Sequence, residues 1–318
     1  MSDQTSLASP AGISMFNGSG FMGKNILSVS QFEIEHLEQI LAMARDMAAM
    51  VGRFGSTDLL KGKILTTLFY EPSTRTFSSF VAAMQRLGGT VIPIQNVQYS
   101  SVSKGESLRD TVRTLAAYCN VIAMRHPEVG SVNSAARALE AYPYKVPVIN
   151  AGDGTGEHPT QAILDIYTIQ QRLTEINGCH VVMVGDLKNG RTVHSLAHLL
   201  ALYDNITITF VSPPALCMPK ERISALRELG CIVFESESLE DVIEYADVLY
   251  VTRVQKERFS DPAEYERLKL QYVVGAEMLN IAQPKMVLIS FKDKQRSCNS
   301  SRLAAKYLID WECEFIYP

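Results

Sequence analysis

Apolar, β-branched segments alternate with amphipathic segments along most of this chain, and this alternation most constrains its fold. The apolar segments are predicted strands, at residues 64–69, 90–94, 121–124, 146–150, 181–184, 206–211, 231–234 and 248–251. The amphipathic segments are predicted helices, at residues 73–84, 107–118, 131–140, 159–173, 192–203, 220–229 and 239–245. Strands and helices in this order are typical of parallel sheets with helices on both faces. We therefore predict an α/β protein with two doubly wound parallel-sheet domains.

The length of the chain sets the expected number of domains. At 318 residues it is long for a single hydrophobic core. The predicted helix at 159–173 would connect a first domain, residues 1–158, to a second, residues 159–318. Ahead of the first strand, the sequence S-Q-F-E at residues 30–33 resembles a capping box and predicts that a helix begins there.

Composition argues against several classes of partner. The net charge is −4 and no basic run stands out, so we do not expect nucleic acid as a partner. No run of about 18 uncharged apolar residues is present, and none is expected to span a membrane. Residues 1–12 lack the pattern of a targeting signal. The six cysteines lie far apart without a C-x-x-C pair, which favours reduced thiols and a cytoplasmic location.

The first predicted strand runs directly into a helix start that is rich in hydrogen-bond donors. Pro72 follows the strand, and Ser73, Thr74, Arg75 and Thr76 form the predicted first turn. A helix start leaves backbone N–H groups without partners, and the positive end of the helix dipole lies behind them. Ordinary caps and a solvated arginine would explain each residue singly. Three hydroxyl groups and a guanidinium in four positions instead favour a phosphate-binding site.

Further cationic side chains follow other predicted strands. Arg125 lies at the end of the third strand, His158 after a glycine-rich segment, and Arg191 and Arg253 at strand ends in the second half. Lys104 lies in a polar loop after the second strand. Each alone would more often be a surface charge. Because ligands of parallel sheets bind beyond the carboxyl ends of the strands, these residues together predict a cleft that binds two anions.

Common cofactor and nucleophile patterns do not fit this sequence. The spacing Gly152-Gly154-Gly156 is not G-x-G-x-x-G, so a nicotinamide cofactor is not expected. His194 and His198 are four residues apart, but residue 195 is Ser195, so the H-E-x-x-H metal motif is absent and we expect no metal. No G-x-S-x-G elbow appears, which leaves covalent catalysis without support. We therefore expect a site without a cofactor.

Several ordered motifs together resemble a known family. They are the S-T-R-T at 73–76, K-G-E at 104–106, M-R-H-P at 124–127, G-E-H-P-T-Q at 156–161, V-G-D-L at 184–187 with G-R-T-V-H-S at 190–195, and T-R-V-Q-K-E-R-F at 252–259. From roughly residue 16 to residue 288 the chain is similar to the aspartate carbamoyltransferase catalytic chain. The S-T-R-T motif is shared with ornithine carbamoyltransferase. The R-V-Q segment belongs to the aspartate enzyme, and the S-M-G loop of the ornithine enzyme is missing.

The resemblance implies a reaction and a role for each motif residue. The enzyme would transfer the carbamoyl group of carbamoyl phosphate to the α-amino group of L-aspartate, giving N-carbamoyl-L-aspartate and phosphate in pyrimidine biosynthesis. In this reading, Ser73, Thr74, Arg75 and Thr76 hold the phosphate, and Thr76, Arg125 and His158 polarise the carbamoyl carbonyl. Gln161 helps to hold the amino group, and Arg191, Arg253 and Gln255 bind the carboxylates of aspartate.

The resemblance also implies an assembly. Ser100 and Lys104 would reach the active site of a neighbouring subunit, because the family works as a homotrimer with shared sites. Association with other enzymes of the pyrimidine pathway is a further partner that it suggests.

The chain departs from the family pattern after residue 288. The family continues with a strand and a His-Pro-Leu-Pro-Arg turn that helps to bind the carbamoyl amide, whereas residues 289–297 here contain no proline. Residues 300–310 are predicted to form a short helix in this non-family tail, 289–318. An alternative function follows from the tail, namely a catalytically impaired or non-catalytic trimer-forming paralogue or isoform. Another carbamoyltransferase is the second alternative.

Overall fold

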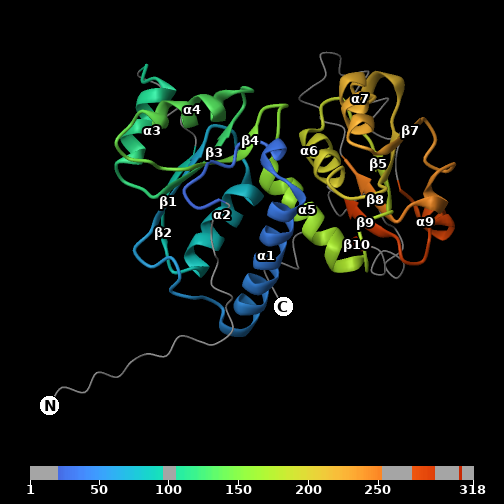
Figure 1. Ribbon diagram of the computed structural model, residues 1–318, viewed down its shortest axis with the longest axis horizontal. Helices are drawn as coiled ribbons and strands as arrows, with labels where there is room; N and C mark the ends of the chain where they lie inside the picture. Colours follow the sequence, from blue (N-terminus) through green and yellow to red (C-terminus); the bar gives the residue numbers. More distant parts are fainter. Residues whose placement is uncertain (1–20, 96–104, 253–273, 291–307, 310–318) are drawn as a thin grey trace.

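Two parallel β-sheets organise the computed structural model, which describes residues 21–95, 105–252, 274–290 and 308–309. Figure 1 shows the two sheets in separate lobes, with helices α1 and α5 between them. This confirms the predicted α/β class with two parallel sheets.

The first sheet contains four parallel strands in the order β2-β1-β3-β4. Their bounds are Ile64–Phe69 for β1, Thr90–Gln95 for β2, Val121–His126 for β3 and Val148–Asp153 for β4. Helices α3 (Leu108–Ala116) and α4 (Ser131–Glu140) pack in one apolar cluster with the inward residues of β1 and β3. Helix α2 (Thr74–Arg86) contributes Met84 to a smaller cluster with Leu65 and Ala123. The sheet is therefore covered on both faces.

The second sheet has the order β10-β9-β8-β5-β6-β7, and all of its pairings are parallel. Its strands are His180–Val184 (β5), Thr207–Val211 (β6), Ile232–Ser236 (β7), Val248–Val251 (β8), Val287–Ser290 (β9) and Leu308–Ile309 (β10). The helical elements that follow these strands are α6 (Arg191–Leu200), η4 (Pro214–Leu216), α7 (Lys220–Glu228), η5 (Ile243–Tyr245) and α9 (Ala276–Ile281). Two apolar clusters, one with α5, α6 and α7 and one with η5 and α9, hold the core.

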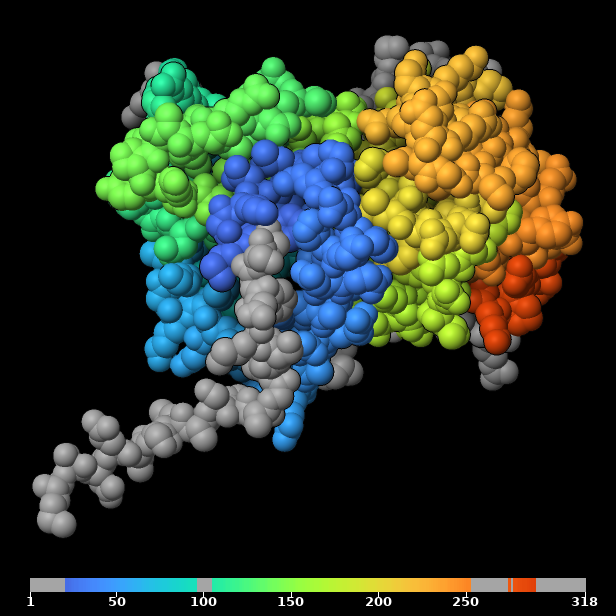
Figure 2. Space-filling view, in the orientation of Figure 1, coloured from blue at the N-terminus to red at the C-terminus, as the bar shows by residue number. Residues whose placement is uncertain are grey.

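Helix α5 (Pro159–Arg172) joins the two sheets. It follows β4 directly, contacts β4 and α6, and buries Ile166 and Ile169 in the larger cluster of the second sheet. Helix α1 (Ile34–Phe54), which precedes β1 in the chain, buries Leu37 and Leu41 in the same cluster. Figure 2 shows the surface of α1 and the segment before it, in blue, between the green and the yellow parts of the molecule. The N-terminal segment thus packs across the junction of the lobes.

Several predicted elements have different bounds in the structure. The capping box lies two residues earlier than predicted and caps the 3₁₀ helix η1 (Val29–Gln31), since Ser28 accepts a hydrogen bond from the N–H of Ser30. Helix α1 begins only at Ile34, after Phe32 has turned into the core in an extended conformation. The predicted helix at 239–245 is a bend that ends in the three-residue η5. Residues 308–309, predicted to be helical, pair as a strand with β9, and residues 300–307 lie outside the described part.

Candidate active site

The carboxyl ends of β1, β3 and β4 meet at one edge of the first sheet, where α2 also begins. Phe69, the last residue of β1, is in register with Arg125 of β3, and Ser73 is the N-cap residue of α2. The hydroxyl of Ser73 makes no capping hydrogen bond, so the ordinary cap explanation does not account for it. Thr74 and Arg75 are exposed in the first turn, and Thr76 is half-buried. This turn presents hydroxyl and backbone donors at the positive end of a 13-residue helix.

Glu71 draws two arginines together across the junction of the lobes. Its Oε2 lies 3.2 Å from Nε of Arg125 and 3.8 Å from Nη1 of Arg191. Arg125 comes from β3 of the first sheet and Arg191 from the first turn of α6 in the second. Burial lowers the pKa of the Arg125 guanidinium, and the charge of Glu71 opposes that shift. A single carboxylate between two arginines leaves a net positive charge for an anionic ligand.

The glycine-rich segment at the end of β4 fits closely against both guanidinium groups. Nη1 of Arg191 donates a hydrogen bond of 2.5 Å to the carbonyl of Gly154, and Nη1 of Arg125 donates one of 3.4 Å to the carbonyl of Ala151. Gly152 has φ +125°, and a Cβ there would lie 2.9 Å from Nη1 of Arg125. Glycine at this position lets the backbone approach both arginines without a clash.

His158 is the N-cap residue of α5 and is almost fully buried. Its backbone N–H donates to Oγ of Ser195 on α6 at 3.1 Å, and its ring Nδ1 lies 3.4 Å from Oγ1 of Thr160. Burial lowers the pKa of the imidazole well below its usual value, and the charges of Arg191 and Arg125 lower it further. The imidazole is therefore neutral near pH 7. When the Thr160 hydroxyl donates to Nδ1, the ring proton is on Nε2, where it can polarise a carbonyl oxygen.

Gln161 follows His158 in the first turn of α5 and is also buried. The structure therefore brings Arg125 and Arg191 together at Glu71, and both arginines interact electrostatically with His158. Gln161 lies three residues after His158 on the same helix. Four other predicted site residues, Ser100, Lys104, Arg253 and Gln255, lie outside the described residues. The strand that leads to Arg253 is described as far as Thr252, whose Oγ1 accepts a hydrogen bond from the N–H of Asp186 at 3.0 Å.

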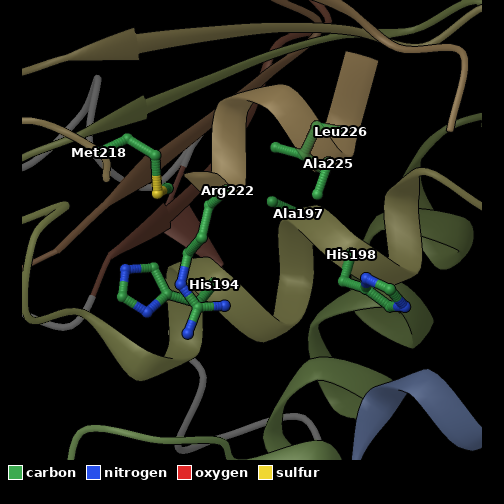
Figure 3. A pocket seen from close by; sticks show the side chains of 7 residues that line it. All are labelled: His194, Ala197, His198, Met218, Arg222, Ala225 and Leu226. Carbon is green, nitrogen blue, oxygen red and sulfur yellow. The ribbon is translucent and has the colours of Figure 1, made fainter. Parts of the chain in front are cut away.

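His194 and His198 both lie on α6 but point to different sides of a small pocket. Figure 3 shows them on opposite sides of the view, with Ala197 between them and Arg222 beside His194. Nε2 of His194 lies 2.7 Å from the carbonyl oxygen of Leu187, and this hydrogen bond gives His194 a structural role. Among the described residues, no group of three His, Cys, Asp or Glu side chains is arranged to hold a metal ion.

Glu71 and Ser195 have structural roles at the site that the sequence did not assign. Glu71 lies two residues after β1, so the sequence could predict that it lies near a strand end. Its two partners, Arg125 and Arg191, are 54 and 120 residues away in the sequence, and the sequence did not indicate these contacts. Ser195 belongs to the helix after Arg191, and only the packing of α5 on α6 brings it to His158. Glu157 is a further case, because it accepts hydrogen bonds from Ser28 and Val29 and so fixes the N-terminal segment to the loop before His158.

This combination of two parallel sheets, an open helix start and arginines drawn from both lobes defines a class of protein. A family model described as the carbamoyl-P binding domain of aspartate/ornithine carbamoyltransferase matches residues 24–171, and a model described as the Asp/Orn binding domain matches residues 177–290. The chain belongs to the aspartate/ornithine carbamoyltransferase family.

Individual relatives point to the aspartate branch. The chain is 51% identical over 267 residues to the multifunctional protein pyr1-3 of Dictyostelium discoideum, covering 84% of this chain but only 12% of that protein. It is 48% identical over 254 residues to the aspartate carbamoyltransferase catalytic subunit of Methanocaldococcus jannaschii, covering 80% of this chain and 81% of that subunit. The crystal structure of Trypanosoma cruzi aspartate transcarbamoylase in complex with carbamoyl aspartate and phosphate has a TM-score of 0.81 and 39% identity, covering 89% and 88% of the two chains.

No helix in the described parts of the chain combines the length and the apolar character needed to cross a membrane.

Proposed function

We propose that this chain is an aspartate carbamoyltransferase, which transfers the carbamoyl group of carbamoyl phosphate to the α-amino group of L-aspartate in pyrimidine biosynthesis. The observation that carries the proposal is the convergence of Arg125, His158 and Arg191 on one point between the lobes, where Glu71 orients both arginines. The relative of known structure from Trypanosoma cruzi holds carbamoyl aspartate and phosphate, the two products of this reaction.

The proposed mechanism uses positioned donors and needs no protein nucleophile. The amino nitrogen of aspartate attacks the carbamoyl carbon, the bond from that carbon to the phosphate oxygen breaks, and the departing phosphate takes the proton of the amine. Arg125, Thr76 and neutral His158 stabilise the charge that develops on the carbonyl oxygen, an effect typically worth a factor of about 10²–10³ per donor. Alignment of the two bound substrates supplies a further part of the rate.

The binding residues are proposed in two groups. Ser73, Thr74, Arg75 and Thr76 hold the phosphate at the start of α2, and Gln161 binds the carbamoyl amino group. Arg191, together with Arg253 and Gln255, binds the carboxylates of aspartate. We accordingly divide the chain into a carbamoyl-phosphate-binding domain, residues 1–158, and an aspartate-binding domain, residues 159–318 with its non-family tail. The two family-model matches support a division in this region, although the first of them extends to residue 171.

We further propose a homotrimer in which Ser100 and Lys104 complete the site of a neighbouring subunit, located in the cytoplasm. The four described cysteines, Cys119, Cys179, Cys217 and Cys231, are free thiols, as a reducing compartment requires. Several relatives are multifunctional proteins of which this chain spans 12% of the length, so association with other enzymes of the pathway is part of the proposal.

A direct assay tests the proposed reaction. The purified full chain is incubated with carbamoyl phosphate and L-aspartate, and carbamoyl aspartate is measured. We expect turnover with aspartate and none with ornithine, because no S-M-G loop is present in the sequence. Arg125→Ala should lower kcat at least about a hundredfold. The matched control Arg113→Ala removes a half-buried arginine that donates to the carbonyl of Ala138, away from the site, and should leave kcat unchanged.

The outcome also decides between this function and the alternatives. A folded trimer that binds phosphate but forms no carbamoyl aspartate would mean that the non-family tail has left a non-catalytic paralogue or isoform. Turnover with ornithine in place of aspartate would assign the chain to another carbamoyltransferase. The comparisons give no support to either alternative, since the relatives named above include aspartate enzymes.

A further inference from the structure

A chain of buried polar side chains begins at Gln161 and leads away from the site. Nε2 of Gln161 donates a hydrogen bond of 2.8 Å to Oδ1 of Asp165, and the hydroxyl of Tyr250 donates one of 2.8 Å to Oδ2 of the same carboxylate. Gln161 and Asp165 lie one turn apart on α5, while Tyr250 comes from β8 in the middle of the second sheet. Asp165 and Tyr250 are both fully buried. The mechanism above uses neither of them.

The chemistry of this chain fixes the orientation of the Gln161 amide. An ionised carboxylate only accepts hydrogen bonds, so Asp165 binds the NH₂ group of the Gln161 amide. The amide oxygen Oε1 of Gln161 is then the end that does not face Asp165. An amide without such a partner can present either end, and its NH₂ end would oppose a ligand that is itself a donor. The amino group of a carbamoyl ligand is a donor. It can therefore bind Gln161 well only when Oε1 is the end that meets it.

We propose that Asp165 and Tyr250 are positioning residues that hold Gln161 with its amide oxygen ready to accept a hydrogen bond from the amino group of carbamoyl phosphate. The inference rests on the proposed function, because it assumes that Gln161 meets that amino group. It deepens the function by assigning the orientation of Gln161 to one buried carboxylate. Through Tyr250, it also connects α5 to β8, the strand that runs toward Arg253.

The protonation state of Asp165 sets the pH range in which this role applies. Burial raises the pKa of Asp165 to about 7, and the hydrogen bonds from Tyr250 and Gln161 oppose the rise. The carboxylate is therefore mostly ionised above about pH 7, and the binding test below is made at about pH 8. Burial and the neighbouring Asp165 raise the pKa of Tyr250 well above its usual value, so its hydroxyl remains a donor. Tyr250 is the titratable side chain in contact with Asp165, and Gln161 carries no charge. A protonated Asp165 would itself be a donor and would no longer select the NH₂ end of the amide.

The test is a binding cycle on the full chain, with carbamoyl phosphate and inorganic phosphate as the two ligands. Calorimetry compares wild type, Asp165→Asn, Gln161→Ala and the double variant. Asp165→Asn should weaken carbamoyl phosphate binding about tenfold, as expected for one lost hydrogen bond, and leave phosphate binding unchanged because phosphate has no amino group. In the Gln161→Ala background, Asp165→Asn should cause no further loss of carbamoyl phosphate affinity, because Asp165 acts through Gln161.

Controls separate positioning from a general structural effect. Thr168→Val, on the same helix, removes a buried hydroxyl that donates to the carbonyl of Leu164, and both ligands should bind it as they bind wild type. Should Asp165→Asn fail to fold, as judged by circular dichroism, Tyr250→Phe replaces it in the cycle, with an expected loss of about threefold to tenfold.

Three results would overturn the inference alone, with turnover in the wild type intact. The first is an equal loss of affinity for both ligands in Asp165→Asn, and the second is an additive loss in the double variant. The third is unchanged carbamoyl phosphate binding in Asp165→Asn. If the wild type bound no carbamoyl phosphate, the proposed function and the inference would fall together. Binding without turnover would leave the cycle valid and would count against the reaction only.

Discussion

The neutral state of His158 is the residue-scale property with the clearest consequence for activity. Burial and the two neighbouring guanidinium groups lower its pKa well below the usual value, so protonation does not switch this residue near pH 6. We expect kcat to show no acid limb from His158 at its ordinary pKa of about 6.5. His158→Ala should lower kcat by a factor of about 10²–10³, because one fixed donor to the carbonyl oxygen is lost. Steady-state rates between about pH 6 and 8 measure both effects.

A matched control for His158 lies on the neighbouring helix. Burial also lowers the pKa of His198, which is half-buried, but this histidine lines the pocket between α6 and α7. His198→Gln should leave kcat within about twofold of wild type, as expected for a change outside the site. An acid limb near pH 6.5 that vanishes in a His158 variant would contradict the neutral imidazole.

His194 gives a prediction for stability instead of activity. Burial, together with the charge of Arg222, lowers its pKa to about 4. The unfolded chain therefore binds a proton at a higher pH than the folded chain does. The stability from neutral His194 is fully present above the unfolded pKa of about 6.5 and is lost as the pH falls toward about 4. At pH 5 the free energy of unfolding should be lower than at pH 7 by about 2 kcal/mol from this group.

His194→Gln is the variant that isolates this effect. Its amide NH₂ can still donate to the carbonyl of Leu187, but it carries no titratable group. Urea unfolding at pH 5 and pH 7 should show a smaller difference between the two pH values in the variant than in wild type. Equal differences would mean that His194 titrates normally in the folded protein.

At the scale of elements, the ends of β5 and β8 are held together at Gly185. Its φ is +121°, and a Cβ there would lie 2.6 Å from the carbonyl oxygen of Thr252. Gly185→Ala should therefore combine backbone strain with a backbone clash and lower the free energy of unfolding by about 3 kcal/mol. Gly178→Ala is the matched control, because its φ is +76° with nothing within 4 Å of the added Cβ. It should cost only about 1 kcal/mol, the strain of positive φ alone. Denaturant unfolding of both variants measures the difference.

The same scale shows what the sequence could predict. Strands β1 to β8 appear close to their predicted places because an apolar run between amphipathic segments has few other structures available. Strand β4 was predicted to end at Asn150 and continues to Asp153, since pairing of Asp153 with His126 extends it through Gly152. The segment at 239–245 has the spacing of a helix, but Leu239 and Ile243 are buried by a tight bend before β8. Tertiary contacts decided both cases.

Individual site residues divide in the same way. The proximity of Arg125, His158 and Arg191 was predictable because Arg125 lies at the end of a strand and the other two follow strands, and parallel strands of a sheet end at a common edge. Glu71, Ser195 and Asp165 were not, because their roles depend on contacts between elements far apart in the sequence. No local pattern distinguishes a carboxylate that orients a site from one that faces solvent.

For the whole molecule, Glu71 is a contact between the lobes as well as within the site. The exposed fraction of its side chain is about one quarter, and the exposed fractions of the two arginine side chains are lower, at 13% for Arg125 and 15% for Arg191. Glu71→Gln should lower the free energy of unfolding by about 1–2 kcal/mol, between the values for exposed and buried ion pairs. It should also raise the KM for aspartate, because Arg191 loses its orientation. The exposed pair of Lys61 and Asp58 provides the control, since Asp58→Asn should change stability by less than about 0.5 kcal/mol.

The proposed trimer leads to a quantitative mixing experiment. If each site takes Arg75 from one subunit and Lys104 from the next, Arg75→Ala and Lys104→Ala homotrimers should each be nearly inactive. A random equal mixture restores a site wherever a subunit with Arg75 precedes one with Lys104, which is about a quarter of all sites. The mixture should therefore recover about a quarter of wild-type activity once subunits have exchanged.

A second mixture makes the experiment decisive. In the proposal, one subunit contributes both Arg75 and Arg125 to a given site. A mixture of Arg75→Ala and Arg125→Ala subunits therefore contains no subunit that has both arginines. That mixture should recover no activity, although its subunits exchange equally well. Native mass spectrometry of differently tagged subunits verifies the exchange in both samples. Recovery in neither mixture would confine each site to a single subunit, and equal recovery in both would mean that the variants are rescued by something other than a shared site.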